Sequence, residues 1–559
     1  MSRDADDFAL PLDQLLTGAA TGPMSRLFPG TSAVRFLDAL RQQPDLVANR
    51  MVGLAGELVQ IATGGSEVAP RRGDRRFADP AWTENPFLKR LVQAYLATAE
   101  VADALVEETP LEWRDAQQMK LAVTNLFQAL APSNNPLLNP VAWKAFIDSG
   151  GTSVLKGSQQ LLQDMATAPR VPSMVDTEAF TVGVDLAATP GSVVYRTDMF
   201  ELIQYTPQTE TVRAVPLLII PPTINKYYVL DLAPGRSLIE YLVQQGQQSF
   251  VISWRNPGAE NRDWGFDAYS EAIIDAFNAV ARISGTDSAH VVATCSGGIL
   301  AALAAAHRAA TGQIDRLASL SLLVTMIDQS SGGVTGSLLD ENTARIAIEK
   351  SQRTGYLDGR DLAEVFAWLR PNDLIWNYWV NNYLQGKKPP KFDILFWNAD
   401  TTRMPAALHK DFVEAAMGNK FASPGAVEVL GTPIDLGALT VDSYVVAGSA
   451  DHICPWANCY RSSQLLGGET RFVLSTNGHI AALVNTPDNP KSSYQAGDDN
   501  SHDADVWRET TPIVKGSWWP DYAEWLARRS GDTVPAPTTL GSPDFPPLQA
   551  APGSYVLAK

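Results

Sequence analysis

Cysteine and basic residues are both scarce in this chain of 559 residues. Three cysteines are too few for a disulfide framework, and such scarcity is typical of a reducing compartment. Lys and Arg number 44 against 61 Asp and Glu, which gives a formal net charge of −17. A nucleic-acid-binding protein needs a basic face to neutralise phosphates, so the charge argues against that class. A small anionic ligand held in a local basic pocket remains compatible with it.

Long apolar segments are also missing. No run of about 18 or more apolar residues occurs, so we predict no membrane-spanning helix. Residues 1–7 lack the basic start and apolar stretch of a secretion signal. We therefore expect a soluble, cytoplasmic protein. Hydrophobic residues make up 45% of the chain, which is enough for a large core and excludes wholesale disorder.

Helical periodicity dominates the first third of the chain. Apolar residues recur at spacings of three and four over 36–61, 87–106 and 113–130. We therefore predict a mainly helical N-terminal region over 1–185. Its amphipathic helices could bind a surface or a partner or activate a dimer, or they could serve packing alone.

Short continuous apolar runs replace the helical pattern after about residue 190. Such runs are typical of buried strands in a parallel sheet, because both faces of that sheet are covered. Segments with helical period lie between them, for example 269–283 and 298–310. We predict an α/β fold with a doubly wound sheet over 186–559. The predicted strands are 200–205, 215–220, 249–254, 290–294, 320–327, 443–447 and 471–474.

The interval from about 335 to 435 contains no comparable strand series. Its pattern is helical and loop-like, and we interpret it as a cap inserted over the sheet. It contains four of the 14 tryptophans, namely Trp368, Trp376, Trp379 and Trp397. The tail from about 530 is rich in Pro, Gly and Thr and is expected to be irregular.

Cys295 lies where a predicted strand ends and a helix begins, in the segment HVVATCSGG at 290–298. A strand-to-helix turn of this kind presents a nucleophile at the top of the sheet, and the helix N-terminus favours a thiolate. Small neighbours are needed because backbone packs on backbone there. The usual pattern has glycine two residues before the nucleophile, where this chain has Ala293. We predict that Cys295 is a catalytic nucleophile.

A nucleophile on such a turn needs an acid and then a histidine, in that chain order. Asp451 lies just past the predicted strand 443–447, and His479 follows the last predicted strand through a short loop. We predict a triad in which His479 takes the proton of Cys295 and Asp451 orients the imidazole. His452 is interpreted either as an auxiliary group of the site or as a loop cap.

Backbone N–H groups are expected to stabilise an acyl oxyanion at this site. Ser296 follows the nucleophile directly, and Ile224 lies in the loop after the strand 215–220. Cys454 and Cys459 lack a second ligand pair at zinc spacing, so we interpret them as packing residues and predict no metal site.

Several motifs together resemble the polyhydroxyalkanoate synthases. They are PPTINKYY at 221–228, VISWRNP at 251–257, CSGG at 295–298, RPNDLIWNYW at 370–379, ADHI at 450–453 and NGHI at 477–480. The resemblance extends from about residue 75 to the end. CSGG, WVNNY at 379–383 and the chain length are similar to the class II, medium-chain-length branch. Ala293, and Ala481 where these relatives usually carry glutamine, depart from the family pattern.

The resemblance implies polymerisation of (R)-3-hydroxyacyl-CoA into polyester with release of CoA, on an α/β-hydrolase-type fold. Cys295 would carry the acyl group as a thioester, and CoA would be part of the substrate and a product, so no bound cofactor is expected. Either His479 or Asp451 would deprotonate the attacking hydroxyl. The implied partners are the growing polyester chain, the polyhydroxyalkanoate granule surface with its associated proteins, and a second copy in a homodimer. The implied location is the granule surface in the cytoplasm.

Substrate contacts are predicted for Arg370, Thr325 and Ala481. Arg370 would face the phosphates of CoA, whereas lysines such as Lys226 are expected to be solvated surface residues. Two other functions stay open. A thioesterase or depolymerase could use the same triad, although such hydrolases more often carry serine as the nucleophile. A non-catalytic granule scaffold is disfavoured by the intact Cys, Asp and His set.

Overall fold

The computed structural model describes residues 12–21, 30–166, 168–330 and 341–559. Residues 1–7, on which the prediction of no secretion signal depends, and the start of the predicted cap at 335–340 lie outside the described residues. The chain divides into two compact units. The sheet unit comprises residues 1–20, 177–359 and 392–559, and the helical unit comprises residues 21–176 and 360–391.

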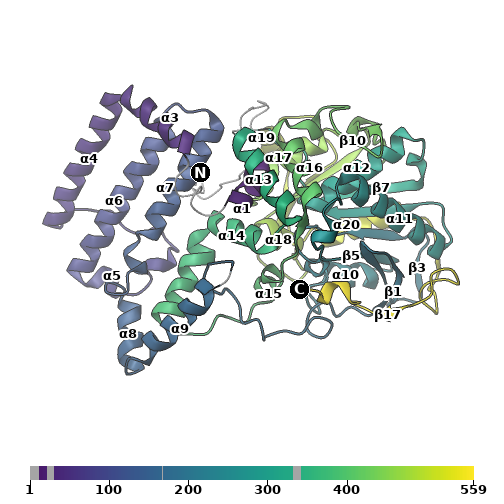
Figure 1. Ribbon diagram of the computed structural model, residues 1–559, viewed down its shortest axis with the longest axis horizontal. Coiled ribbons are helices and arrows are strands. Elements are labelled where there is room, and N and C mark those ends of the chain that lie inside the picture. Colours follow the sequence, from purple (N-terminus) through teal and green to yellow (C-terminus); the bar gives the residue numbers. More distant parts are fainter. Residues whose placement is uncertain (1–11, 22–29, 167, 331–340) are drawn as a thin grey trace. The chain divides into compact units, whose positions relative to one another are not determined.

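Within the described residues, an 11-stranded sheet forms the centre of the sheet unit (Figure 1). Its order is β15-β14-β13-β12-β7-β6-β4-β5-β2-β1-β17. The strands from β5 to β13 in this order run parallel, and the strands at both edges pair antiparallel. The predicted doubly wound α/β sheet is therefore confirmed. The strands are β1 (Gly191–Arg196), β2 (Phe200–Tyr205), β4 (Leu217–Ile220), β5 (Ser249–Trp254), β6 (Ala289–Thr294), β7 (Leu317–Leu323), β12 (Ser443–Gly448), β13 (Thr470–Ser475), β14 (Ser493–Gly497), β15 (Ile513–Lys515) and β17 (Gln549–Ala550).

Helices cover both faces of this sheet. Side chains from α10 (Leu238–Gln244), α18 (His479–Leu483) and α20 (Trp519–Ala527) join strand residues in one large hydrophobic cluster. The helices α11 (Phe266–Ser284) and α12 (Ser296–Ala310) pack against each other and against β4 and β6. Because helices lie on both faces, β4, β5 and β6 are buried at every position.

The helix α1 (Leu12–Thr21) packs within the sheet unit for almost its whole length. Leu16 is buried, and its carbonyl oxygen lies 3.4 Å from Nε2 of His409 on α16 (Ala406–Met417). Lys350 on α13 (Glu341–Thr354) donates a hydrogen bond to the carbonyl of Ala20 at 2.6 Å. The two-unit division thus assigns α1, up to Ala20, to the sheet unit, whereas the sequence predicted one helical region over 1–185.

The helical unit contains the antiparallel neighbours α4, α6 and α7, which lie side by side (Figure 1). Pro44 begins α4 and separates it from α3, because proline has no N–H to donate but fits the first helical turn. The segment 36–61, with its predicted helical periodicity, therefore spans parts of two helices. The helices of this unit are α3 (Gly30–Arg41), α4 (Pro44–Thr63), α5 (Ala81–Glu84), α6 (Pro86–Glu108), α7 (Trp113–Ala129), α8 (Pro140–Asp148), α9 (Thr152–Ala166) and most of α14 (Gly359–Leu369).

The interval predicted as a cap is divided between the two units. Residues 360–391 belong with the N-terminal helices, and their π-helical segment Trp379–Leu384 packs on α9. A Cβ atom at Gly157 would collide with the carbonyl oxygen of Tyr383, so only glycine allows this approach. The rest of the interval, including α13, α15 (Asp393–Ala399) and α16, lies in the sheet unit.

The four tryptophans of this interval separate accordingly. Trp376 contacts both Trp368 and Trp379 edge to face inside the helical unit. Trp397 is buried in the large hydrophobic cluster of the sheet unit, and its indole N–H donates to the carbonyl of Lys226 at 2.7 Å. No helix in the described ranges combines the length and the apolar composition that a membrane crossing requires.

Candidate active site

Cys295 occupies a sharp turn between β6 and α12. Its φ of 52° lies in the left-handed region, which residues with a side chain rarely adopt outside functional sites. The N–H of Cys295 donates to Leu323 at 3.0 Å, and its carbonyl accepts from Gly298 at 2.9 Å. Cys295 is half-buried, whereas Thr294 and Ser296 on either side are buried. The turn therefore presents the thiol at the carboxyl end of the parallel strands.

Close backbone packing explains the two glycines after Ser296. A Cβ atom at Gly297 would collide with the carbonyl oxygen of Pro221, and one at Gly298 would collide with the side chain of Thr325. Ser296 binds the same loop as Gly297, because its Oγ accepts a hydrogen bond from the N–H of Thr223 at 3.0 Å. The turn and the loop at 221–226 are thus held together.

Thr325 lies beneath the turn rather than in an open pocket. Its side chain is fully buried, and its Oγ1 donates to Leu323 at 3.1 Å, with the carbonyl of Cys295 at 3.4 Å. The structure therefore places Thr325 as support for the Cys295 backbone. The predicted contact with substrate has no counterpart in these hydrogen bonds.

Asp451 and His479 come from adjacent parallel strands. Asp451 follows β12 and His479 begins α18 after β13, and Gly448 pairs with Ser475 at the ends of the two strands. The Nδ1 atom of His479 lies 2.7 Å from Oδ2 of Asp451. Both side chains are buried. Strand register therefore brings together the acid and the base that the sequence places 28 residues apart.

Cys454 is a third member of the Cys295–His479 group, and the sequence analysis missed it. The two Sγ atoms and a ring nitrogen of His479 all lie within 4.8 Å of one another. Cys454 is held there because its N–H donates to Oδ1 of Asp451 at 2.9 Å. The only sequence signal was its position three residues after Asp451, on the loop that follows β12. The interpretation of Cys454 as a mere packing residue is therefore incomplete.

The charges of the site favour a thiolate paired with an imidazolium. The Cys454 thiol, which can donate a hydrogen bond to Cys295, lowers the pKa of Cys295 well below its ordinary value, with His479 adding to the effect against burial. The same contact, together with burial, raises the pKa of Cys454. Burial lowers the pKa of His479, but Asp451 and Cys295 outweigh it and raise that pKa to about 10. One proton of the pair thus resides on His479 at neutral pH.

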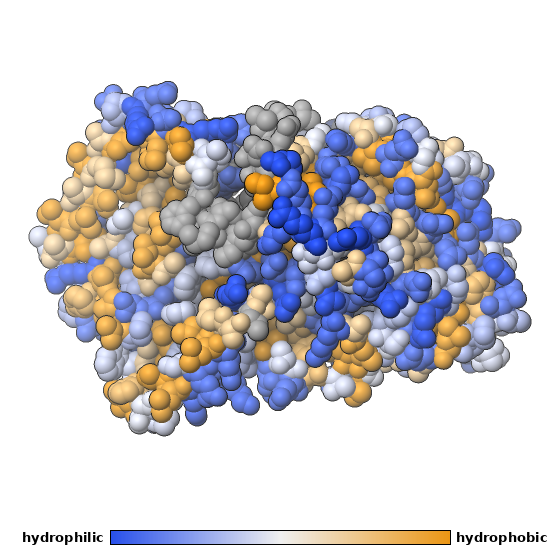
Figure 2. Space-filling model, in the orientation of Figure 1, coloured by the Kyte–Doolittle hydropathy of each residue, from blue (hydrophilic) through white to orange (hydrophobic). Residues whose placement is uncertain are grey.

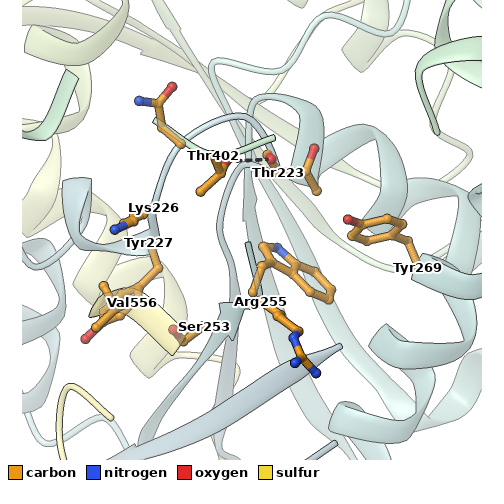
Figure 3. A pocket seen from close by; sticks show the side chains of 10 residues that line it. Thr223, Lys226, Tyr227, Ser253, Arg255, Tyr269, Thr402 and Val556 are labelled. Carbon is orange, nitrogen blue, oxygen red and sulfur yellow. Dashed lines mark hydrogen bonds between the residues drawn. The ribbon is translucent and has the colours of Figure 1, made fainter. Parts of the chain in front are cut away.

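The backbone donors predicted for an oxyanion lie in two places. The N–H of Ser296 faces the Cys295 thiolate and helps to lower its pKa. Ile224 lies in the loop at 221–226, where its carbonyl accepts hydrogen bonds from the N–H of Thr402 at 3.2 Å and from its Oγ1 at 2.6 Å. Thr402 also donates to the carbonyl of Thr223 at 3.1 Å (Figure 3). Thr402 therefore fixes the orientation of this loop.

Lys226 corrects one expectation from the sequence. It lines a small pocket next to this loop together with Thr223 and Thr402 (Figure 3). Its side chain is only 4% exposed, and its Nζ lies 2.7 Å from Oδ1 of Asp400. Lys226 is a buried ion-pair partner rather than a solvated surface lysine. Burial lowers its pKa, and Asp400 opposes that effect.

Three predicted residues remain, namely Arg370, Ala481 and His452. Arg370 belongs to the helical unit, where it is exposed and pairs with Asp373. Ala481 is exposed on α18, two residues after His479. His452 is half-buried next to Asp451 in the chain.

One group among the described residues could hold a metal ion, namely Cys295, Cys454 and His479. Two thiolates and an imidazole are ligands that zinc prefers. An ion bound there would occupy the sulfur that the triad needs as its nucleophile. The prediction of no metal at this site therefore stays a prediction.

Comparisons with known proteins agree with the geometry. Residues 73–242 match a family model described as "Poly-beta-hydroxybutyrate polymerase (PhaC) N-terminus", and residues 216–486 match one described as "alpha/beta hydrolase fold". The chain is 44% identical over 518 residues to "Poly(3-hydroxyalkanoate) polymerase 2" of Ectopseudomonas oleovorans, covering 93% of this chain and 92% of that protein. It is 43% identical over 526 residues to polymerase 1 of the same organism, covering 94% of each. "Poly(3-hydroxyalkanoate) polymerase subunit PhaC" of Cupriavidus necator is 37% identical over 506 residues, covering 89% of this chain and 85% of that protein. The α/β-hydrolase-type fold is thereby confirmed.

Proposed function

Because the chain belongs to the poly(3-hydroxyalkanoate) polymerase family, we propose that it joins the acyl groups of (R)-3-hydroxyacyl-CoA into polyester and releases CoA. The observation that carries the proposal is the half-buried Cys295 beside the hydrogen-bonded pair of Asp451 and His479. Cysteine suits this substrate, because the attacking and leaving groups of the first step are both sulfur.

The first step transfers the acyl group to the enzyme. The Cys295 thiolate attacks the thioester carbonyl, the bond to the CoA sulfur breaks, and the proton on His479 passes to the departing thiolate. Asp451 stabilises the imidazolium and holds its Nδ1. The product is free CoA and a 3-hydroxyacyl thioester on Cys295.

The negative charge on the carbonyl oxygen needs fixed donors in that step. The N–H groups of Ser296 and Ile224 are assigned this role. The hydrogen bonds from Thr402 to the Ile224 carbonyl hold that peptide in place, and the Thr223–Ser296 bond joins both donors in one rigid turn. Fixed donors stabilise the oxyanion without reorganisation during the reaction.

Elongation requires a hydroxyl nucleophile. After CoA leaves, His479 is neutral and takes the proton of the 3-hydroxyl of another acyl group, whose oxygen then attacks the thioester carbonyl. An ester bond forms and the bond to the Cys295 sulfur breaks. Asp451 would act as this base only by losing its hydrogen bond to His479, so His479 is the better assignment.

We assign medium-chain-length acyl groups to the enzyme. The CSGG and WVNNY motifs, similar to those of the class II branch, support this assignment. Ala481 is exposed two residues after His479, where class II relatives usually carry the longer glutamine side chain. We propose that this departure from the class II pattern alters the preference of the enzyme for acyl chain length.

The helical unit is proposed to contact the polyester product. Apolar side chains are exposed along α4 and over α8 and α9, where Figure 2 shows them gathered on the surface. They are Met51, Val52, Leu58, Val59, Trp143, Phe146, Ile147, Val154, Leu155 and Leu162. A growing polyester attached to Cys295 is itself apolar, so burial of these side chains against it is favourable. Attachment to granules follows from this contact.

The decisive experiment measures CoA release from (R)-3-hydroxydecanoyl-CoA together with the size of the product. Thiol release with high-mass polyester, lost in Cys295→Ala, is the expected result. Thiol release that yields only the free hydroxy acid would identify a thioesterase instead. A third outcome is that the wild type releases no CoA from (R)-3-hydroxydecanoyl-CoA or from (R)-3-hydroxybutyryl-CoA. The enzymatic proposal then fails, and a scaffold role is favoured.

A further inference from the structure

Two thiols of different character meet at the active site. Cys295 is half-buried on the rigid turn between β6 and α12, and Cys454 is 5% exposed on the loop between β12 and α17 (Trp456–Ser463). Their Sγ atoms lie within 4.8 Å of each other, and both cysteines are free thiols. Triad chemistry uses only Cys295, so the position of Cys454 against it calls for another role.

We propose that Cys454 is the resolving thiol of Cys295, so that a hydroperoxide converts the two residues into a reversible disulfide. The inference goes beyond the polymerase reaction and assigns a modification site to the pair. A nucleophile oxidised in this way is held in a recoverable state. Without a resolving thiol, further oxidation yields a sulfinic acid, which is not reduced by simple thiols.

The reaction balances with a hydroperoxide as the oxidant. The Cys295 thiolate attacks one peroxide oxygen, the O–O bond breaks, and with hydrogen peroxide the leaving hydroxide becomes water by taking up a proton. The sulfur is oxidised by two electrons to a sulfenic acid. The Cys454 sulfur then attacks the Cys295 sulfur, the S–S bond forms, and the S–O bond breaks. The hydroxide leaves as water with the proton of the Cys454 thiol, which His479 is placed to relay.

The geometry suits this sequence of steps. The oxidised residue must be reachable and in thiolate form, and Cys295 is partly exposed with a lowered pKa. A disulfide has an S–S length of about 2 Å, so the two sulfurs need to approach by less than about 3 Å. Cys454 lies in an irregular segment, where a shift of the backbone breaks no helix or strand.

Cys459 provides an internal comparison. It is fully buried on α17, and its Sγ lies 3.7 Å from the carbonyl oxygen of Cys454. The group of ligand atoms within 4.8 Å contains the sulfurs of Cys295 and Cys454 but not that of Cys459. We therefore expect Cys454 and not Cys459 to trap the sulfenic acid.

The test oxidises the reduced full-length protein with a small excess of hydrogen peroxide and then maps its peptides without reduction. A peptide pair linked through Cys295 and Cys454 is the expected result. This readout needs no activity, so its outcome is independent of whether the protein polymerises hydroxyacyl-CoA. An unlinked pair, or a link from Cys295 to Cys459, would overturn the proposal.

Variants give the second readout, with Cys454→Ser compared with Cys459→Ser. Each variant is oxidised, treated with dithiothreitol, and scored as the fraction of its own starting CoA-release rate that returns. Wild type and Cys459→Ser are expected to regain most of their rate, and Cys454→Ser about ten-fold less, with Cys295 found as sulfinic acid. Equal recovery in Cys454→Ser would refute the role of Cys454. Thermal unfolding of each variant confirms that it is folded.

Discussion

Asp451 holds His479 with one carboxylate oxygen and its own loop with the other. Oδ2 lies 2.7 Å from Nδ1 of His479, while Oδ1 accepts from the N–H groups of Ile453 at 2.8 Å and Cys454 at 2.9 Å. The substitution Asp451→Asn separates these two roles. Its side-chain carbonyl oxygen can still accept the hydrogen bonds from the loop, but its NH₂ group donates and cannot accept the hydrogen bond of His479 Nδ1.

Asp451→Asn is therefore expected to reduce kcat on the order of 10³-fold, because the imidazole loses its orientation and its charge partner. CoA release under saturating substrate measures the effect. The thermal unfolding temperature should stay close to that of the wild type. A loss of less than about ten-fold would show that Asp451 does not orient His479.

The pH dependence of Cys295 alkylation tests the ion pair directly. Because the pKa of Cys295 is lowered and that of His479 is raised to about 10, the thiolate is already formed at neutral pH. Iodoacetamide should alkylate Cys295 at a constant rate from about pH 7 to 9, whereas His479→Gln should show a rate that rises with pH, because the thiolate has lost its imidazolium partner and keeps the contact with Cys454. Peptide mapping assigns the label to Cys295.

The pH dependence of kcat tests the same ion pair at high pH. As the pH rises through about 10, His479 loses the proton that the departing CoA needs, so kcat should fall while alkylation of Cys295 persists. A kcat that keeps rising above that pH would contradict the assignment of His479 as the proton donor.

Gly297→Ala and Gly53→Ala form a matched pair of substitutions. The added methyl at Gly297 presses on the Pro221 carbonyl, so we expect a loss of about 1–3 kcal/mol in stability and of nearly all activity. Gly53 lies inside α4, and apart from the backbone of its own helix no atom lies within 4 Å of the new methyl, so alanine should stabilise by about 0.5–1 kcal/mol. Urea unfolding midpoints and CoA release measure both. Equal effects at the two sites would refute the close packing at the turn.

The buried histidines His290 and His409 are expected to lower the folding stability of the protein in acid. Burial lowers the pKa of His290 to about 4 and that of His409 to about 4, whereas an unfolded histidine titrates near 6.5. Between these values the unfolded chain binds protons that the folded chain does not, so stability is present above about pH 6.5 and is lost as the pH falls towards 4. Each histidine contributes up to about 3 kcal/mol to this loss.

Denaturant midpoints measured between pH 7 and 4.5 test this contribution for His290, whose ring nitrogens contact Ser319 at 2.7 Å and Ser530 at 3.1 Å. His290→Gln should unfold with a weaker dependence on pH than the wild type, whatever its stability at pH 7. An unchanged dependence would mean that His290 is protonated in the folded protein.

The proposed polyester contact is tested with charges on α9. Leu155 and Leu162 are each 73% exposed and lie two helical turns apart on one face. The double substitution to Glu should lower binding to poly(3-hydroxyalkanoate) particles several-fold in a sedimentation assay. Ile513→Glu, at a residue equally exposed in the sheet unit, serves as the control. If only the oligomeric state changes, the surface binds a second copy instead.

The sequence predicted the centre of the sheet better than its edges. The strand 249–254 was predicted with its observed bounds, because apolar runs distinguish strands that are covered on both faces. The strand 200–205, whose pattern looked extended, was also predicted with its observed bounds. The edge strands β14 and β15 were missed, since half-exposed and exposed residues give no such run. The predicted strand 320–327 ends early, because Val324 adopts a φ of 44° that no strand continues.

The site shows the same limit for residues that act through tertiary contacts. Cys295, Asp451 and His479 were found because each follows a predicted parallel strand, and the carboxyl ends of parallel strands lie at the same edge of the sheet. Cys454 and Lys226 were misjudged, because a thiol beside a thiolate and a buried ion pair with Asp400 arise only when distant loops meet. Short sequence patterns contain no information about such tertiary contacts.

The path of the chain between the two units has a consequence for its synthesis. The chain leaves the sheet unit after residue 20, returns at 177, leaves again at 360 and returns at 392. Helix α9 packs on the segment around Tyr383, which is synthesised much later than α9 itself. Helix α1 contacts His409, which is synthesised later still. Neither unit can complete its fold from one continuous stretch of the chain. A protein truncated at a single position therefore contains an incomplete copy of at least one unit. The nascent protein therefore depends on its last third before its first helices are fully buried.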